Sequence, residues 1–210
     1  RWGYFPSVGL GWNMHEESFL KNVKFLSSAK LRGSWGQTGN NRIPDYSYWA
    51  QMRSLISKDG DTYSSEYVFN DINSTGYAIT SPGNEELKWE TTTQTDIGLD
   101  LSFFKQRISF KADVYKKVTD GLLLNANLPP SFGFSSSLMN IGKVSNKGLE
   151  LTLESQNIKT KSFQWNSSFN ISFNKNEVLA LSRNEESLVS VISYSNAYIA
   201  RIGQPLGTMY

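Results

Sequence analysis

Fifteen consecutive residues, Leu87 to Leu101, alternate without a break between two kinds of side chain. Every odd-numbered position is apolar or threonine, and every even-numbered position is polar, charged or glycine. Because successive side chains of a strand point to opposite faces, this pattern predicts one strand with an apolar face and a charged face. Strands of globular domains average about 5 to 6 residues, whereas a membrane-crossing strand needs about 9 to 11. The length of the segment therefore favours a strand that crosses a membrane.

The same two-residue period recurs in five further segments, so we expect an all-β chain with about six amphipathic strands. The five segments are Tyr4–Met14, Leu31–Gly39, Arg107–Val118, Gly148–Gln156 and Phe163–Asn174. Bacterial outer-membrane barrels start at about eight strands, so six strands cannot close a barrel by themselves. The chain is then either a sandwich that folds on itself or part of a larger antiparallel transmembrane barrel.

The connections between these strands fall into two length classes. Residues 103–106 and 157–162 form short polar turns, whereas residues 40–84 and the stretch around Pro129 and Pro130 form long connections. Loops longer than about 12 to 15 residues are uncommon unless they are functional. Short turns on one side and long loops on the other are typical of outer-membrane barrels, with the turns in the periplasm and the loops outside.

Three other segments are less regular. Residues 16–28 predict one or two helical turns, because two glutamates precede a run of apolar residues. Residues 176–205 are expected to form another outer loop, and Gly207–Tyr210 to begin a seventh strand.

The composition argues against enzyme chemistry and nucleic-acid binding. The chain carries 21 basic and 19 acidic residues, so it has no strongly positive footprint for nucleic acid. The absence of cysteine and the single histidine, His15, leave no disulfide and no thiolate or histidine cluster for a metal. The sequence has no nucleophile elbow, P-loop or dinucleotide fingerprint, and no apolar run of about 18 residues that could form a transmembrane helix. We therefore expect neither an enzyme nor a cofactor.

Three carboxylates, Glu90, Asp96 and Asp100, share the charged face of the first strand described above. Paired carboxylates are the catalytic groups of glycoside hydrolases, so a hydrolase has to be considered. A hydrated lattice of opposite charges explains them better, because cationic side chains are expected on the same or neighbouring faces. These side chains are Lys88, Arg107 and Lys111. Lys116 does not fit the pattern, since it shares the parity of the apolar side chains and is expected near the outer rim.

Aromatic residues mark the ends of the expected strands. Aromatic rings gather at both interfaces of a bilayer, so we expect these residues to form the girdles of a barrel. The short-turn girdle comprises Trp12, Phe103, Phe104, Phe163 and Trp165, and the outer girdle contains Trp89. Aromatic residues in the core of a β-sandwich would give the same pattern.

Several sequence blocks resemble the SusC/RagA-like branch of TonB-dependent outer-membrane transporters. The blocks are FPSVGLGW at 5–12, LRGSWGQTGN at 31–40, LKWE and the strand after it at 87–100, DVY at 113–115, NIG at 140–142, NKGLEL at 146–151 and GQP at 203–205. They cover nearly the whole chain in the order found in the family. One departure is SPGNEE at 81–86, which replaces the usual Asn-Pro before Leu-Lys-Trp-Glu.

The resemblance implies a 22-stranded barrel around an N-terminal plug, in the outer membrane of a Gram-negative bacterium. Residues 1–210 would be a partial barrel domain from its C-terminal half, with the plug and the closing strands lying outside it. The implied activity is TonB-dependent import of oligosaccharides or peptides. The implied partners are a SusD-like surface lipoprotein, the TonB complex acting through an N-terminal region, and outer-membrane lipid. The alternatives are a soluble β-sandwich carbohydrate-binding module and a small adhesin or structural outer-membrane barrel.

Aromatic residues of the first long loop are the candidates for contact with the substrate or with the lid lipoprotein. They are Tyr46, Tyr48, Trp49, Tyr63, Tyr67, Phe69 and Tyr77. Flat aromatic rings can stack on sugars or seal against a protein surface, but they can equally pack the loop against itself. Asp59, Asp61 and Glu66 form a weak calcium candidate, because they lack the spacing of a complete calcium-binding loop.

Overall fold

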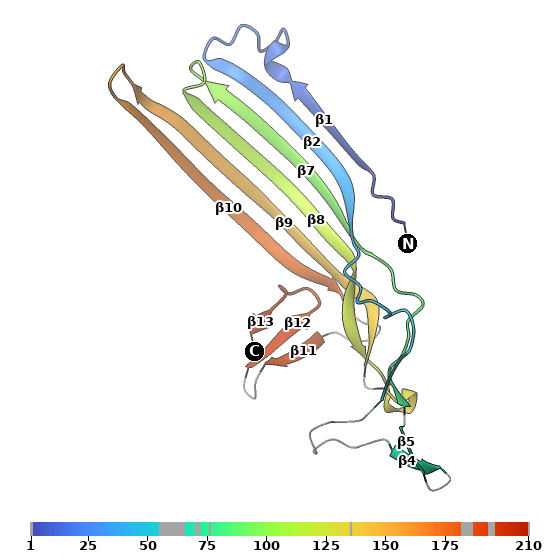
Figure 1. Ribbon diagram of the computed structural model, residues 1–210. Helices are drawn as coiled ribbons and strands as arrows, with labels where there is room; N and C mark the ends of the chain where they lie inside the picture. Colours follow the sequence, from blue (N-terminus) through green and yellow to red (C-terminus); the bar gives the residue numbers. More distant parts are fainter. Residues whose placement is uncertain are drawn as a thin grey trace. The chain divides into compact units, whose positions relative to one another are not determined.

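A computed structural model describes residues 2–54, 66–69, 72–75, 77–134, 136–181, 187–192 and 196–209. Its main feature is a six-stranded antiparallel sheet in which neighbouring strands follow the chain order (Figure 1). The strands are β1 (Ser7–Asn13), β2 (Leu26–Asn40), β7 (Glu90–Phe103), β8 (Ile108–Asn127), β9 (Ser136–Lys159) and β10 (Gln164–Ala180). The sheet is open, with β1 and β10 at its edges. The prediction of an all-β chain with six long amphipathic strands is confirmed.

Shorter strands complete the described part of the chain. β3 (Gln51–Ser54) pairs with β6 (Tyr77–Ser81), and β4 (Glu66–Phe69) pairs with β5 (Ile72–Thr75). β12 (Asn196–Arg201) lies between β11 (Ser187–Ile192) and β13 (Thr208–Met209). Two short 3-10 helices, η1 (Met14–Glu16) and η2 (Pro130–Phe132), lie in connections. Among the described residues no helix is long and apolar enough to cross a membrane.

The chain divides into two compact units. One comprises residues 1–39, 91–120 and 142–210, and the other comprises residues 40–90 and 121–141. The first unit holds most of the six-stranded sheet, and the second holds the long connections with the strand segments next to them.

The register of the sheet places apolar residues opposite apolar residues on neighbouring strands. Ile97 of β7 lies opposite Val114 of β8, and Leu101 lies opposite Phe110. The same holds for β9 and β10, where the partners are Leu149 and Phe173, Leu151 and Ile171, and Leu153 and Phe169. Polar side chains alternate with these pairs and lie opposite one another. The sheet therefore has one apolar face and one polar face, as the two-residue period predicts.

The apolar face is open to its surroundings. Val114 is 55% exposed, Ile97 59% and Phe169 61%. Among the described residues only six apolar side chains are buried: Ala29, Leu87, Ala126, Val144, Val178 and Leu181. A β-sandwich requires a second sheet packed on the exposed apolar face of the first. The described residues provide no such layer, so the soluble sandwich alternative does not fit, whereas a face in contact with lipid does.

Several predicted boundaries need correction. β7 begins at Glu90 rather than at Leu87, because the amide side chain of Asn140 takes the place of a strand partner at Lys88. It accepts from the Lys88 N–H at 2.8 Å and donates to the Lys88 carbonyl at 2.8 Å. Leu87 is buried at 2% exposure. An alternating pattern in the sequence does not reveal that a side chain will form the hydrogen bonds of a neighbouring strand.

Other predicted boundaries also differ from the structure. Residues 16–28 contain one helical turn, in which the Lys21 N–H donates to the Glu17 carbonyl at 2.8 Å, and β2 begins already at Leu26. Residues 176–205 do not form only a loop, because β10 continues to Ala180 and β11 and β12 follow. Thr208 and Met209 form a strand, but it pairs with β12 and not with the six-stranded sheet.

The assignment of the two faces predicts unequal costs for arginine at neighbouring positions. Ile97→Arg places a cation on the apolar face and should lower the free energy of unfolding in a bilayer by about 2 to 4 kcal/mol. Asp96→Arg stays on the polar face and should cost much less. Urea titration of the full-length protein in lipid vesicles measures both values, and equal costs would contradict the assignment.

Candidate functional site

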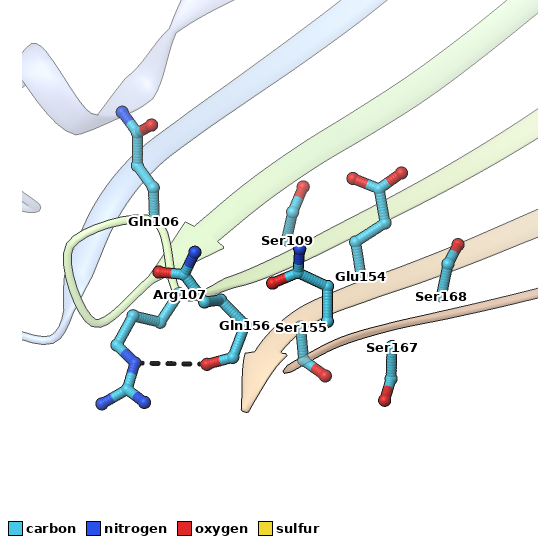
Figure 2. A pocket seen from close by; sticks show the side chains of 9 residues that line it. Gln106, Arg107, Ser109, Glu154, Ser155, Gln156, Ser167 and Ser168 are labelled. Atoms are coloured by element: carbon cyan, nitrogen blue, oxygen red, sulfur yellow. Dashed lines mark hydrogen bonds between the residues drawn. The ribbon is translucent and has the colours of Figure 1, made fainter. Parts of the chain in front are cut away.

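A polar hollow of about 430 Å³ lies at the turn end of the sheet, between the β7–β8 turn and strands β9 and β10 (Figure 2). Ser109, Glu154 and Ser168 point to one side of these strands, whereas Ser155 and Ser167 point to the other. Arg107 lies at one end, where its guanidinium donates to the carbonyls of Gln156 at 3.3 Å and Asn157 at 2.9 Å. The hollow is lined by hydroxyl, amide and charged groups, so it suits water and not an apolar ligand.

The turn beside this hollow has an unusual backbone. Phe104, Lys105 and Gln106 have φ values of +53°, +56° and +65°, a conformation that costs about 1 to 2 kcal/mol per residue outside glycine. Hydrogen bonds to the preceding connection hold the turn in place. The Phe104 N–H donates to the Phe25 carbonyl at 2.8 Å, and the Gln106 N–H donates to Ser27 Oγ at 3.2 Å. The sequence carries no glycine or asparagine that would signal this turn.

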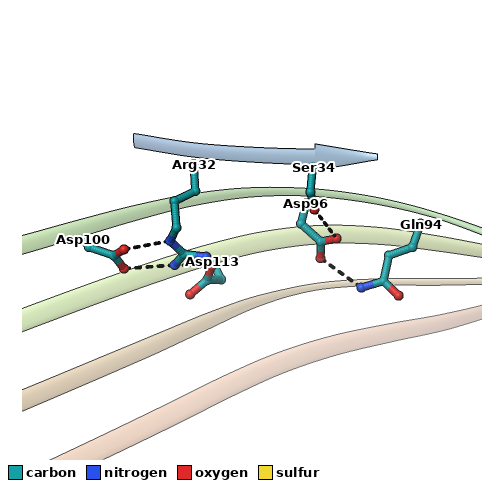
Figure 3. Close-up of polar contacts among 6 residues, drawn as sticks. All are labelled: Arg32, Ser34, Gln94, Asp96, Asp100 and Asp113. Carbon is teal, nitrogen blue, oxygen red and sulfur yellow. Dashed lines mark hydrogen bonds and ion pairs between the residues drawn. The ribbon is translucent and has the colours of Figure 1, made fainter. Parts of the chain in front are cut away.

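A charge cluster lies on the polar face of the sheet and joins three strands (Figure 3). Arg32 of β2 donates through Nε to Asp100 Oδ2 at 2.7 Å and through Nη2 to Asp100 Oδ1 at 2.9 Å. The same Nη2 also donates to Asp113 Oδ1 of β8 at 2.8 Å. One guanidinium therefore bridges two carboxylates on neighbouring strands with the two-pronged geometry that makes arginine a strong carboxylate partner.

Gly98 makes this bridge possible. It lies on the polar face of β7 between Asp96 and Asp100 and opposite Asp113. A Cβ atom at this position would lie only 2.6 Å from Arg32 Cζ, well inside the normal contact distance. Because Gly98 has no side chain, the guanidinium can cross β7 and reach the next strand. The sequence shows the parity of Arg32 and Gly98, but not that β2 lies beside β7.

A second set of polar contacts continues along β7. Ser34 Oγ donates to Asp96 Oδ2 at 3.2 Å, and Gln94 Nε2 donates to Asp96 Oδ1 at 3.0 Å (Figure 3). In the other unit, Glu90 accepts from Asn40 Nδ2 at 2.7 Å and from the Leu123 N–H at 3.0 Å. Each of the three carboxylates of the sequence pattern thus has its own donors. Among the described contacts only Asp100 of the three is ion-paired, and its partner is Arg32 rather than Lys88, Arg107 or Lys111. Asp96 and Glu90 accept from neutral donors, so the three carboxylates do not resemble an acid–base pair that shares one substrate position.

Three aromatic residues of the first long connection form an exposed group, here called the aromatic platform: Tyr46, Tyr48 and Trp49. The Tyr46 and Trp49 rings stack with centroids 6.5 Å apart, and Tyr48 meets Trp49 edge-on at 6.2 Å. Tyr46 is 73% exposed and Trp49 64%. Gly83 packs against the backbone of this segment, since a Cβ there would lie 2.6 Å from the Ala50 nitrogen. The rings thus contact each other, and Tyr46 and Trp49 remain mostly exposed.

The other loop candidates are less well placed. Tyr77 begins β6 and is 67% exposed. Tyr67 and Phe69 belong to β4, where only the backbone is described, and Tyr63 lies outside the described residues. Asp59 and Asp61 also lie outside them, and Glu66 is the first residue of β4. Within the described residues no group of three metal-binding side chains occurs.

The residues of the predicted short-turn girdle lie where strands meet short connections. Trp12 is 46% exposed, Phe104 55%, and Phe163 and Trp165 more than half. Phe103 stacks on Phe25 with centroids 6.2 Å apart, and Trp12 meets Phe19 at 6.3 Å. The sequence pattern missed Phe19 and Phe25, because they belong to a connection and not to a strand. Trp89 is half-buried and precedes β7.

Comparison with known proteins shows which family this architecture belongs to. The family model described as TonB dependent receptor-like, beta-barrel matches residues 1–205. The chain therefore belongs to the TonB-dependent receptor β-barrel family.

Individual relatives agree with this assignment. TonB-dependent receptor P39 of Formosa agariphila is 39% identical over 100% of this chain and 18% of its own length. TonB-dependent receptor SusC of Bacteroides thetaiotaomicron is 38% identical over 89% of this chain and 18% of its own length. The RagAB peptide importer in its open-open state superposes with a TM-score of 0.80 and 26% identity, over 97% of this chain and 20% of the other. The resemblance to SusC and RagA is thereby confirmed, and the chain spans about one fifth of the length of these relatives.

The role of Gly98 can be tested with a matched glycine. Gly98→Ala should displace the Arg32 guanidinium and lower the free energy of unfolding by about 1 kcal/mol, since the lost charged hydrogen bonds are partly screened by water. Gly33→Ala is the control, because a Cβ at Gly33 has no heavy atom within 4 Å. Urea unfolding of the full-length protein in vesicles gives both values. Equal effects would show that the crossing over Gly98 contributes nothing.

Proposed function

We propose that this chain forms part of the wall of an outer-membrane importer in a Gram-negative bacterium, which takes up oligosaccharides, or peptides, with energy supplied through TonB. The observation that carries the proposal is the two-faced sheet of a TonB-dependent receptor, whose apolar face is bare and whose polar face carries paired charges. A bare apolar face suits lipid, and a wetted face of paired charges suits a solute pathway. Membership of the family and similarity to SusC and RagAB support the same activity.

The rest of the barrel and the plug belong, in this proposal, to a longer protein of which residues 1–210 form a partial barrel domain. The open edges at β1 and β10 support this arrangement, because an exposed sheet edge requires further strands within a bilayer. They also weigh against a small self-contained adhesin or porin. The TonB complex would act through the N-terminal region of the longer protein, and a SusD-like lipoprotein would cover the loop side.

The aromatic platform favours oligosaccharides as the substrate class. Its exposed rings offer flat faces of the kind that stack on the apolar faces of sugar rings. The RagAB importer carries peptides, so peptides are the second candidate class. The two classes differ in their dependence on ring stacking, and this difference makes them separable.

Substitution of the platform should weaken binding of the substrate. With the full-length transporter and its lipoprotein, Trp49→Ala should raise the Kd of a bound oligosaccharide about tenfold, since a stacked ring contributes about 1.4 kcal/mol. Phe132→Ala is the control, because Phe132 is an aromatic residue of another long connection and is also 64% exposed. Isothermal titration with panels of oligosaccharides and peptides measures the effect. Binding of peptides alone, unchanged by Trp49→Ala, would overturn the assignment to sugars.

The import activity itself needs a separate measurement. Cells that express the full-length protein should accumulate a labelled substrate only while TonB is present, because the proposed transport is energised through TonB. Accumulation that persists after loss of TonB would contradict active import and favour a passive pore.

A further inference from the structure

Three lysines lie next to the apolar pairs on the apolar face of the sheet, and a fourth, Lys143, lies further out on that face and is ion-paired with Asp120. Lys116 of β8 lies opposite Thr95 of β7, between the apolar pair Ile97 and Val114 and the outer end of both strands. Lys147 of β9 and Lys175 of β10 lie directly opposite each other, two residues beyond the apolar pair Leu149 and Phe173. All three therefore share the parity of the side chains expected to face lipid.

The three lysines form one row across adjacent strands. The Gln156 N–H donates to the Arg107 carbonyl at 2.7 Å, which aligns β9 with β8. Arg107 and Gln156 are thus opposite each other in antiparallel strands. Nine residues after Arg107 and nine residues before Gln156, Lys116 therefore lies opposite Lys147. Counting thirteen residues in the same way brings Asp120 opposite Lys143, and these two side chains are ion-paired at 2.8 Å. The row Lys116–Lys147–Lys175, here called the lysine row, thus spans three strands about 4.8 Å apart.

The row is unfavourable for the isolated protein. Like charges directly opposite each other in a sheet destabilise the strand pair, and cations on a lipid-facing surface add to this cost. Glu177 lies 3.6 Å from Lys175, and it provides the row's ion pair among the described residues. Lys116 and Lys147 have no ion-pair partner in the described part of the chain and are exposed. The three positive charges of the lysine row therefore exceed the one negative charge of Glu177.

The depth of the row matches the outer surface of a bilayer. Lys175 lies ten residues along β10 from Trp165 of the short-turn girdle. Ten residues span about 33 Å along a strand, and a tilt of about 40° converts this to a height of about 25 Å. The apolar band of an outer-membrane barrel is also about 25 Å tall. The three ammonium groups would then lie at the level of the outer headgroups, with apolar side chains directly beneath them.

We propose that the lysine row binds the phosphate groups of an anionic lipid in the outer leaflet, a phosphorylated glycolipid of the lipid A type. Its acyl chains would lie on Val114, Leu149 and Phe173, each two residues below a lysine. Bound phosphate removes the repulsion within the row, and long lysine side chains can converge on one headgroup. The proposal rests on the outer-membrane location but not on the import activity.

The test uses the full-length transporter in detergent and diphosphoryl lipid A as the probe. The triple variant K116Q/K147Q/K175Q should bind lipid A about tenfold more weakly than the unaltered protein, as measured by native mass spectrometry across a lipid titration. K30Q/K111Q/K117Q removes the same charge from the polar face and should bind lipid A as the unaltered protein does. Dephosphorylated lipid A should bind the unaltered protein and the row variant equally weakly.

Several results would overturn the proposal. Unchanged lipid A binding by the row variant, or an equal loss in the control variant, would exclude a specific site. Displacement of lipid A by inorganic phosphate at a matching concentration would mean that the row takes a free anion and not a lipid. Heat-modifiable migration on gels checks that each variant is folded, and K147Q alone, in the middle of the row, serves if the triple variant does not fold. The measurement needs no substrate, so its outcome is independent of the import assay.

Discussion

Strand register is the constraint on which the rest of this structure depends. In a sheet with a period of two, a slip of one residue would move every side chain to the opposite face. The observed register places Ile97 opposite Val114 and Leu151 opposite Ile171, so the apolar face stays continuous across strands. Backbone groups are satisfied between strands, and this allows the apolar face to remain bare in lipid. A soluble domain would have to cover that face.

The polar face follows a different rule, because its long side chains reach across strands and do not pack against each other. Arg32 crosses β7 above Gly98 and bridges Asp100 and Asp113. Such a bridge holds three strands together by charge while it leaves the groups partly wetted. This combination suits the wall of a polar pathway.

Three features of the described chain depart from a regular two-faced sheet with polar connections. The turn at Phe104, Lys105 and Gln106 adopts a left-handed backbone and is held by contacts with the preceding connection. The lysine row places cations on the face that should be apolar. The aromatic platform keeps stacked rings exposed in a long connection. The contacts with the preceding connection hold the turn, whereas the lysine row and the aromatic platform are the places where we propose external ligands.

The sequence by itself determined the strands, their two faces and their family, because alternation and block motifs are local properties of the chain. It placed Asp100 on the polar face and Lys116 on the apolar face, but it could not show which strands are neighbours. Only the tertiary structure decided that Arg32 reaches Asp113 over Gly98 and that Lys116 joins Lys147 and Lys175 in a row. It also decided that β7 starts at Glu90, where an asparagine side chain far along the chain ends the ladder. These features depend on register between segments distant in sequence, which no local pattern encodes.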